Sequence, residues 1–311
     1  MSRVLVTGAA GFIGSHTTDL LLAEGHDVWG LDNFRTGHPA NLDAARQQPR
    51  FQFVEADCAE PSVADEVFRA HRPDAVIHLA AMVSVPESIA HPAENDRLNF
   101  QATRLIAEAA KAHGVKRIVF ASSAAVYGAN PNLPLRETAE CVPLSPYGTA
   151  KLNSEKLLLE LARAEGVTAR CHRYFNVFGP RQDPSSPYSG VISLFQKRLR
   201  ARQAPTIHGD GNQTRDFIHV ADVARANVLA ATAPGIPSGV ANICTGHAVS
   251  LNELYAHLSR VFGENLAPTH GPARAGDIRH SLGSPDKAKR ELGFVAAIPF
   301  EAGLRTLASI Q

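Results

Sequence analysis

The chain has 311 residues, with 31 Lys and Arg against 30 Asp and Glu, so its formal net charge is +1. This balance provides no global field that would attract nucleic acid or an anionic membrane surface, and neither is expected as a partner. The four cysteines, Cys58, Cys141, Cys171 and Cys244, are far apart and form no metal-binding spacing, so no metal site is expected.

The first half of the chain alternates short β-branched runs with longer helical patterns. Strands are predicted over residues 3–7, 27–31, 51–55, 75–79, 117–121 and 167–173, and helices over 14–24, 63–70, 95–113 and 146–165. Strict alternation of this kind favours right-handed crossovers and a parallel sheet. The prediction is therefore an α/β fold with a doubly wound parallel sheet of the Rossmann type, whose ligands bind beyond the carboxyl ends of the strands.

The composition changes in residues 179–190, which hold three prolines and two glycines and are predicted to form a loop. Helical patterns follow over 191–202, 219–232, 250–262 and 284–292. We expect one domain over residues 1–172, with a return segment near 213–235, and a smaller α/β domain over 173–311.

The chain begins almost directly with a strand-like run, Val4-Leu5-Val6, and shows no signal peptide. No apolar stretch reaches the length of a membrane span. The dispersed cysteines fit thiols in a reducing compartment. We therefore expect a cytoplasmic protein.

Three glycines, Gly8, Gly11 and Gly14, stand between the first predicted strand and the first predicted helix. Such glycines let the backbone approach a pyrophosphate closely, and the helix N-terminus supplies free amides and a positive dipole end. Asp32 ends the next strand, where a carboxylate can accept both hydroxyls of an adenosine ribose; a helix or turn cap is the alternative role. Because Asp32 would repel a 2′-phosphate, NAD is the expected cofactor.

Other residues extend this candidate cofactor site. Arg35 lies close to Asp32 and could accept a 2′-phosphate, which leaves the tolerance of NADP open. Asp57 follows the third strand and could accept a hydrogen bond from the adenine amino group, although a turn residue is nearly as good an interpretation. The remaining candidate cofactor contacts are Phe12, Ile13, Asn33 and Ala80.

Tyr147 and Lys151 stand four residues apart, and both lie on one face of a helix that begins near Pro146. A phenol has an unperturbed pKa of about 10, and a nearby ammonium lowers that pKa. Such a pair can move a proton to or from a sugar hydroxyl. A solvated helix face would be the better explanation of an isolated pair, but here a dinucleotide fingerprint and a serine-rich strand end precede it.

Several motifs, in the same order along the chain, carry a family resemblance. They are the glycine motif, His78-Leu79-Ala80-Ala81, Ser122 to Gly128, Tyr147-x-x-x-Lys151, Arg173 to Pro180, Thr214 to Val220 and Arg274 to Asp277. Together they resemble the extended short-chain dehydrogenase/reductases. Within that family the chain is similar to the nucleotide-sugar 4-epimerases of the UDP-glucose/UDP-galactose type.

The resemblance implies roles for the central residues. Tyr147 would be the catalytic acid and base, and Lys151 would lower its pKa while holding the nicotinamide ribose. Ser123 matches the catalytic Ser/Thr that hydrogen-bonds the sugar 4-hydroxyl. Asn99 matches an asparagine of the cofactor site that braces the active-site strand. These roles place residues 1–172 as the NAD-binding domain and 173–311 as the nucleotide-sugar-binding domain.

The same resemblance implies a substrate site. Asn176, Arg215 and Arg274 match contacts to the substrate diphosphate, and Ser84 is a further candidate. Ser281 stands where relatives that accept only plain hexoses tend to carry a bulky tyrosine. A serine there leaves room for a 2-acetamido group, so UDP-GlcNAc and UDP-GalNAc are expected substrates beside the plain UDP-hexoses.

The residues after Ser123 discriminate between reactions. Dehydratases and decarboxylases of the family carry acidic side chains there, whereas this chain has Ala124 and Ala125, which cannot transfer a proton. The expected reaction is 4-epimerisation by transient oxidation at sugar carbon 4, rotation of the 4-keto sugar and re-reduction. A nucleotide-sugar reductase or dehydrogenase of the same family is the nearest alternative, and a non-catalytic NAD-sensing protein is the alternative from another class.

Two further expectations concern packing. His78 and His219 are interpreted as buried, hydrogen-bonded structural residues, and Asp216 as a residue that positions a loop. By analogy with the family, residues 95–110 and 151–165 would form a four-helix contact between two copies, so a homodimer is expected.

Overall fold

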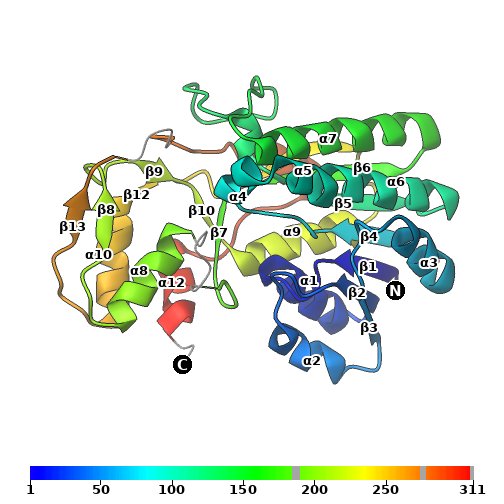
Figure 1. Ribbon diagram of the computed structural model, residues 1–311, viewed down its shortest axis with the longest axis horizontal. Coiled ribbons are helices and arrows are strands. Elements are labelled where there is room, and N and C mark those ends of the chain that lie inside the picture. The colour runs from blue at the N-terminus through cyan, green and yellow to red at the C-terminus, as the bar shows by residue number, and fades with distance from the viewer. Residues whose placement is uncertain (184–189, 274–277, 309–311) are drawn as a thin grey trace.

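The computed structural model describes residues 1–183, 190–273 and 278–308, and its centre is a parallel sheet (Figure 1). In this part of the chain the sheet has seven strands in the order β11-β6-β5-β4-β1-β2-β3. The strands are β1 (Arg3–Thr7), β2 (Asp27–Asp32), β3 (Phe51–Glu55), β4 (Ala75–His78), β5 (Arg117–Ser123), β6 (Thr168–Tyr174) and β11 (Gly239–Ile243). All neighbouring pairs are parallel, which confirms the predicted doubly wound sheet.

The strand order reverses between β1 and β4. The chain winds outward from β1 through β2 to β3, then returns to β4 on the other side and continues outward. At such a switch point the crossover connections leave in opposite directions and open a crevice beyond the carboxyl ends of the strands. The glycine loop that follows β1 lies at this crevice.

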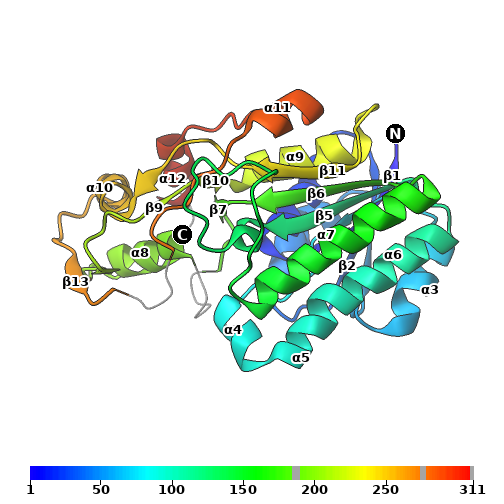
Figure 2. The same ribbon diagram turned by 90° about the horizontal axis from the view of Figure 1, so that it is seen from above.

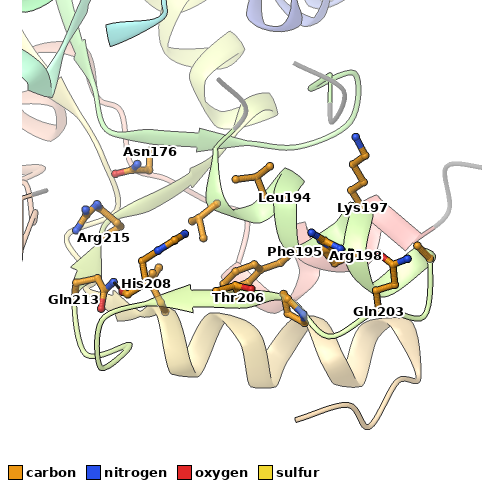
Figure 3. Close-up of a pocket in the computed structure, with 14 residues that line it drawn as sticks. Asn176, Leu194, Phe195, Lys197, Arg198, Gln203, Thr206, His208, Gln213 and Arg215 are labelled. Atoms are coloured by element: carbon orange, nitrogen blue, oxygen red, sulfur yellow. Dashed lines mark hydrogen bonds between the residues drawn. The ribbon is translucent and has the colours of Figure 1, made fainter. Parts of the chain in front are cut away.

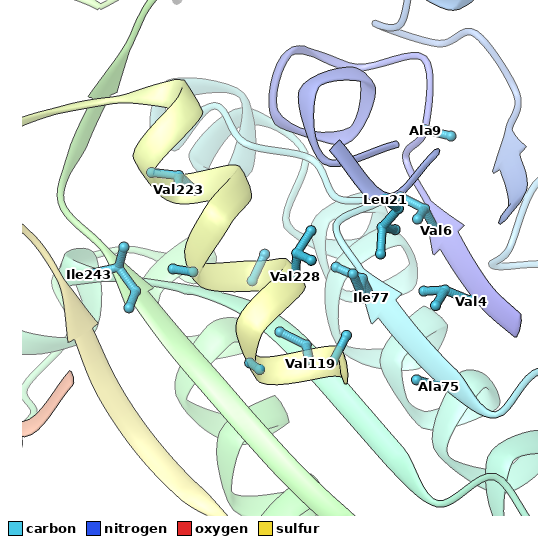
Figure 4. Packing of buried hydrophobic residues seen from close by; sticks show 14 of the residues in the cluster. Val4, Val6, Ala9, Leu21, Ala75, Ile77, Val119, Val223, Val228 and Ile243 are labelled. Carbon is cyan, nitrogen blue, oxygen red and sulfur yellow. The ribbon is translucent and has the colours of Figure 1, made fainter. Parts of the chain in front are cut away.

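Helices cover both faces of the sheet (Figure 2). On one face α3 (Pro61–His71), α6 (Ala102–Ala112) and α7 (Pro146–Glu165) pack over a core that includes Phe68, Ile106 and Leu158. On the other face α1 (Phe12–Ala23) and α9 (Val220–Thr232) pack over a second core that includes Leu21, Val223 and Val228 (Figure 4). The shorter helices of this half are α2 (Asp43–Arg46), α4 (Val85–Ala90), α5 (Pro92–Asn95) and α11 (Asp286–Leu292), with 3-10 turns at Pro39–Leu42 and Ala124–Tyr127.

The single helix predicted over residues 95–113 is divided in the structure. A π-helical turn, Asp96–Gln101, joins α5 to α6. The side-chain oxygen of Thr103 donates to the carbonyl of Asn99 at 2.6 Å. The Asn99 side chain hydrogen-bonds the backbone of Met82, and its amide nitrogen also donates to the side chain of Asn95 at 2.6 Å. π turns of this kind occur frequently at functional sites because they redirect one side chain. Periodicity alone does not reveal such a turn.

A second, smaller region holds the remaining elements. These are β7 (Asn176–Phe178), α8 (Val191–Arg200), β8 (Thr206–His208), β9 (Thr214–Arg215), β10 (Phe217–His219), β12 (Val249–Ser250), α10 (Leu251–Phe262), β13 (Thr269–Gly271) and α12 (Phe300–Ala308). Its own core includes Phe178, Phe195, Phe217, Leu254 and Leu304. The four helices predicted after residue 190 agree with α8, α9, α10 and α11 to within two residues at each end, whereas α12 was not predicted.

The chain passes between the two regions more than once. After β10 it returns to the sheet as α9 and then as β11, which pairs with β6, and it leaves again at β12. Strand β6 extends across the predicted boundary between residues 172 and 173. The division into two functional domains stays a prediction.

A buried ion pair fixes helix α7 against the sheet. The guanidinium of Arg173, on β6, donates from Nε and Nη2 to the two carboxylate oxygens of Glu155 at 2.9 and 2.7 Å. The hydroxyl of Ser122, on β5, donates to the same carboxylate. The side chains of Arg173 and Glu155 are only 5% and 2% exposed, and the Arg173 guanidinium also stacks over the ring of Tyr127. Removing one partner of such a pair leaves an uncompensated buried charge and typically costs about 3–5 kcal/mol.

Candidate active site

The glycine loop packs at distances that only glycine allows. Gly8 has a φ of +71°, and a Cβ on it would lie 2.8 Å from the backbone nitrogen of Ala80. A Cβ on Gly14 would overlap the carbonyl oxygen of Gly8. The N-cap of α1 is Gly11, so no side chain caps this helix N-terminus. Its amides and its dipole are therefore available to an anionic group such as a pyrophosphate.

Asp32 lies at the end of β2, beside this loop. One carboxylate oxygen accepts the amide of Ala10 at 2.9 Å and the other accepts the amide of Phe34 at 2.8 Å. Burial raises the pKa of Asp32, and the backbone hydrogen bonds counteract that shift. Because each carboxylate oxygen can accept more than one hydrogen bond, the carboxylate is oriented and still able to accept from a ribose diol.

Asp57, at the end of β3, already has partners. One of its oxygens accepts the amide of Ala59 at 2.9 Å, and the other accepts from Arg97 at 3.1 Å. Arg97 lies on the π-helical turn and was not foreseen from the sequence. A contact between Asp57 and adenine stays a prediction.

A chain of buried hydrogen bonds connects the glycine loop to the π-helical turn. The Thr7 hydroxyl lies 2.7 Å from Nδ1 of His78, and Nε2 of His78 lies 3.2 Å from the hydroxyl of Thr103. Burial lowers the pKa of His78 to about 3, so the ring is neutral, as expected for a structural histidine. The Asn99 side chain bonds both the amide and the carbonyl of Met82 at 3.1 Å. Asn99 therefore braces the segment that follows β4.

Helix α7 brings Tyr147 and Lys151 together. It begins at Pro146, as predicted, and the hydroxyl of its N-cap, Ser145, accepts the amide of Gly148 at 3.2 Å. The Lys151 ammonium nitrogen lies 5.7 Å from the centre of the Tyr147 ring. Ser123, at the end of β5, hydrogen-bonds the Tyr147 side chain. The phenol, the ammonium and the serine hydroxyl therefore share one site.

Two further residues define the surroundings of this pair. Ser88 is buried on α4, and its hydroxyl accepts the amide of Tyr147 at 3.3 Å. The ring of Phe120, on β5, has its centre 4.8 Å from the Lys151 nitrogen. A cation over an aromatic face is stabilised by the quadrupole of the ring. Sequence reasoning missed both residues, because their contacts depend on how α4 and β5 pack against α7.

Burial shifts the pKa values of both Tyr147 and Lys151. It raises the pKa of Tyr147, although the hydrogen bond with Ser123 counteracts the shift. It lowers the pKa of Lys151 from 10.5 to about 7. For the protein by itself, burial outweighs any effect of Lys151 on the phenol, so the expected lowering of the Tyr147 pKa by Lys151 stays a prediction. Desolvation disfavours each charged form separately, and only a tyrosinate beside an ammonium would offset that cost.

The second region contains a cavity of about 550 Å³ (Figure 3). Asn176 and Arg215 lie at one end, and Lys197, Arg198 and Gln203 lie toward the other. The remaining lining residues are Val191, Leu194, Phe195, Ala201, Pro205, Thr206, His208, Gln213 and Leu251. The lining thus combines apolar side chains with polar and cationic groups, which suits a flat base joined to an anionic group.

Sequence reasoning found only two residues of this cavity, Asn176 and Arg215. Most of the lining comes from α8, β8 and the residues between them, and none of these segments carries a motif. The clustered bases at the end of α8 were the one available signal, and a solvated helix end explains such a cluster equally well.

The other predicted substrate residues have different surroundings. Ser84 is buried, and its hydroxyl caps α4 by accepting the amide of Glu87 at 3.0 Å. The amide of Ser281 donates to the carbonyl of Thr214 at 3.1 Å, which joins this residue to the strand that carries Arg215. Arg274 lies outside the described residues.

Asp216, next to Arg215, holds a loop as expected. Its carboxylate accepts the amide and the hydroxyl of Thr245 at 2.9 and 2.7 Å, and the amide of Gly246 at 2.9 Å. His219 also fits its structural interpretation, because burial lowers its pKa to about 4 and its ring packs edge-on against Phe178.

Comparison with known proteins identifies the family. A family model described as the NAD dependent epimerase/dehydratase family matches residues 4–244. The chain belongs to this family. The match covers the glycine loop, the Tyr147–Lys151 pair and Arg215, and it confirms the resemblance to the extended short-chain dehydrogenase/reductases.

Three solved structures are similar to this epimerase/dehydratase chain over nearly its whole length. A UDP-glucose 4-epimerase from Thermotoga maritima with UDP-glucose is 37% identical, has a TM-score of 0.93 and covers 98% of this chain and 97% of its own. A UDP-N-acetylglucosamine 4-epimerase from Methanobrevibacter ruminantium in complex with UDP-N-acetylmuramic acid is 36% identical, with a TM-score of 0.94 and coverage of 99% and 97%. A UDP-glucose 4-epimerase from Thermus thermophilus in complex with NAD is 34% identical, with a TM-score of 0.89 and coverage of 98% and 97%.

The buried ammonium predicts a pH-dependent stability. Between pH 10.5 and about 7 the unfolded chain binds a proton at Lys151 that the folded chain refuses, so the free energy of unfolding falls as the pH falls through this window. We expect Lys151→Met to be more stable than the wild type at about pH 7, and this advantage to shrink by up to about 3 kcal/mol at about pH 9.5. Urea unfolding followed by circular dichroism at both pH values measures the difference. Lys156→Met, an exposed lysine on the same helix, should show no such pH dependence; equal advantages for Lys151→Met at both pH values would contradict the argument.

Proposed function

We propose that the chain is an NAD-dependent 4-epimerase of UDP-hexoses. The observation that carries the proposal is the meeting of Tyr147, Lys151 and Ser123 at the carboxyl edge of a sheet whose glycine loop suits a dinucleotide. The similarity to UDP-sugar 4-epimerases over nearly the whole chain supports it.

The cofactor would lie in the crevice between β1 and β4. Gly8, Gly11 and Gly14 would admit its pyrophosphate to the N-terminus of α1, and Asp32 would accept the hydroxyls of its adenosine ribose. The fit rests on the close packing at the glycines and on the uncapped helix N-terminus. NAD held there would supply the acceptor for the hydride of sugar carbon 4 and the donor that returns it to the opposite face.

The residues of the chain move the proton. Tyr147 as tyrosinate accepts the proton of the sugar 4-hydroxyl, either directly or through Ser123, and later returns a proton to the 4-keto oxygen. Lys151 stabilises the tyrosinate as its positive neighbour. Burial penalises the charged form of each group. We therefore expect the loss of the Tyr147 proton to favour the protonated form of Lys151.

The nucleotide half of the substrate would occupy the cavity in the second region. Asn176 and Arg215, with Arg274, would bind the diphosphate, and the apolar side chains of the lining would contact the base. The sugar then extends toward Tyr147 and is free to turn about its link to the diphosphate. Since the nucleotide stays fixed while the sugar presents its second face, binding energy should concentrate on the UDP portion. Ala124 and Ala125 offer no second acid or base, which is consistent with epimerisation alone.

Incubation with UDP-glucose or UDP-galactose, followed by separation of the epimers, tests the proposal. We expect interconversion with no net change in nicotinamide absorbance, because the cofactor is regenerated in each cycle. Tyr147→Phe should reduce the rate by about 10²–10⁴-fold, since it removes the acid and base, while the purified variant retains NAD. A net change in nicotinamide absorbance would indicate a reductase or dehydrogenase, and full turnover by Tyr147→Phe would exclude the assigned base.

Ser281 is proposed to admit 2-acetamido sugars, because its side chain is small and it lies next to the strand of Arg215. We expect the wild type to epimerise UDP-GlcNAc as well as UDP-glucose. Ser281→Tyr should abolish turnover of the acetamido sugars and preserve turnover of UDP-galactose. An equal fall in both activities would refute a gating role.

We also propose that two copies associate through α6 and α7, which lie side by side on one face of the sheet (Figure 2), to form a cytoplasmic homodimer. In the described ranges, no helix combines the length and the apolar character that crossing a membrane requires. Light scattering should give about twice the 33.3 kDa mass of the chain. A monomer mass at working concentration would refute the dimer.

A further inference from the structure

Arg35 is the cation that stands beside the proposed ribose site. It follows Asp32 by three residues on the loop after β2, and the side-chain oxygen of Asn33 accepts its amide at 3.1 Å. The short turn through Asn33 keeps Arg35 close to Asp32. A free arginine at this place would suit a 2′-phosphate, and a carboxylate there opposes one. The state of the Arg35 side chain therefore bears on the choice between NAD and NADP.

The guanidinium of Arg35 is engaged by two carboxylates. Its Nη2 lies 2.8 Å from Glu87, on α4, and its Nη1 lies 2.9 Å from Glu94, on α5. Both terminal nitrogens of the guanidinium fork are thus used by acids from the segment that follows β4. A phosphate would have to displace both acids to obtain a bidentate contact.

A second arginine holds Glu94 in place. Nε and Nη2 of Arg97 lie 2.9 and 3.0 Å from the Glu94 carboxylate, and Nη1 of Arg97 lies 3.1 Å from Asp57. These hydrogen bonds lower the pKa of Glu94, so it stays charged. The network ties the ends of β2 and β3 to α4 and α5, and networks of this kind contribute more than isolated surface pairs.

The charges around the ribose site are mainly negative. Two guanidinium groups, those of Arg35 and Arg97, are shared among the carboxylates of Asp57, Glu87 and Glu94, and Asp32 adds a further carboxylate three residues before Arg35 in the chain. A 2′-phosphate carries close to two negative charges at neutral pH. A 2′-phosphate would therefore be repelled by the excess of carboxylates, because both guanidinium groups are already engaged in ion pairs.

We propose that Glu87 and Glu94 determine the preference for NAD over NADP by holding Arg35 in ion pairs away from the 2′ position. The inference rests on the proposed cofactor site. It assigns specificity to two acids that lie far from Asp32 in the sequence and that belong to a different strand-to-helix connection.

Competition between the two dinucleotides tests this assignment. Purified protein is incubated with mixtures of NAD and NADP, and native mass spectrometry measures which dinucleotide is retained. We expect the wild type to retain NAD. The variant Glu87→Gln/Glu94→Gln keeps the side-chain shapes and frees Arg35, so its relative affinity for NADP should rise at least about tenfold, or about 1.4 kcal/mol.

Two controls isolate the role of Arg35. Adding Arg35→Ala to the double variant should abolish the gain in NADP retention. Glu60→Gln removes an exposed acid 3.5 Å from Arg97 that does not touch Arg35, and it should leave the selectivity unchanged. Thermal unfolding of each variant confirms that it is folded.

Each outcome has one meaning. A double variant that still prefers NAD as strongly as the wild type overturns the inference and leaves the cofactor site intact. A gain that persists without Arg35, or that also appears in Glu60→Gln, overturns it in favour of a general charge effect. A wild type that retains neither dinucleotide refutes the proposed function itself, and the inference with it.

Discussion

The buried ion pair between Glu155 and Arg173 holds helix α7 in place, and the candidate site depends on it. Tyr147 and Lys151 come from α7, whereas Ser123 comes from β5, so their distances are set only by how the helix packs on the sheet. Glu155 lies on α7, two turns beyond Tyr147, and its carboxylate binds Arg173 of β6 and Ser122 of β5. The buried charge pair carries a desolvation penalty, and it fixes the geometry on which proton transfer relies.

Burial has different consequences at two neighbouring positions of α7, Lys151 and Glu155. At Glu155 the buried charge is fully paired, and the result is rigidity. At Lys151 burial lowers the pKa of the ammonium to about 7, while the nearby ring of Phe120 favours the charged form. A group that gains or loses its proton easily at neutral pH is suited to a site where a phenol must do the same. The helix therefore combines a fixed anchor with an adjustable charge.

The sequence alone predicts what depends on local spacing. The glycine spacing around Gly14, the strand alternation and the start of α7 at Pro146 all follow from periodicity and cap residues, and the structure agrees with them. What depends on packing between distant segments was not predictable. Ser88 reaches Tyr147 only because α4 lies against α7, the cavity forms where Asn176, Arg215 and Leu251 meet residues 191–208, and the phenol pKa follows from desolvation that a sequence does not display.

The return of the chain to the main sheet as α9 and β11 affects how the protein can be made. Helix α9 covers one face of the sheet, and its Val223 and Val228 complete the core there (Figure 4). During synthesis this apolar face stays open to water until residues 220–243 have left the ribosome, after most of the cavity-bearing segments α8 and β8. A fragment ending near residue 172 would keep α1 on that face but lack α9, so part of the apolar face would be exposed and prone to aggregate.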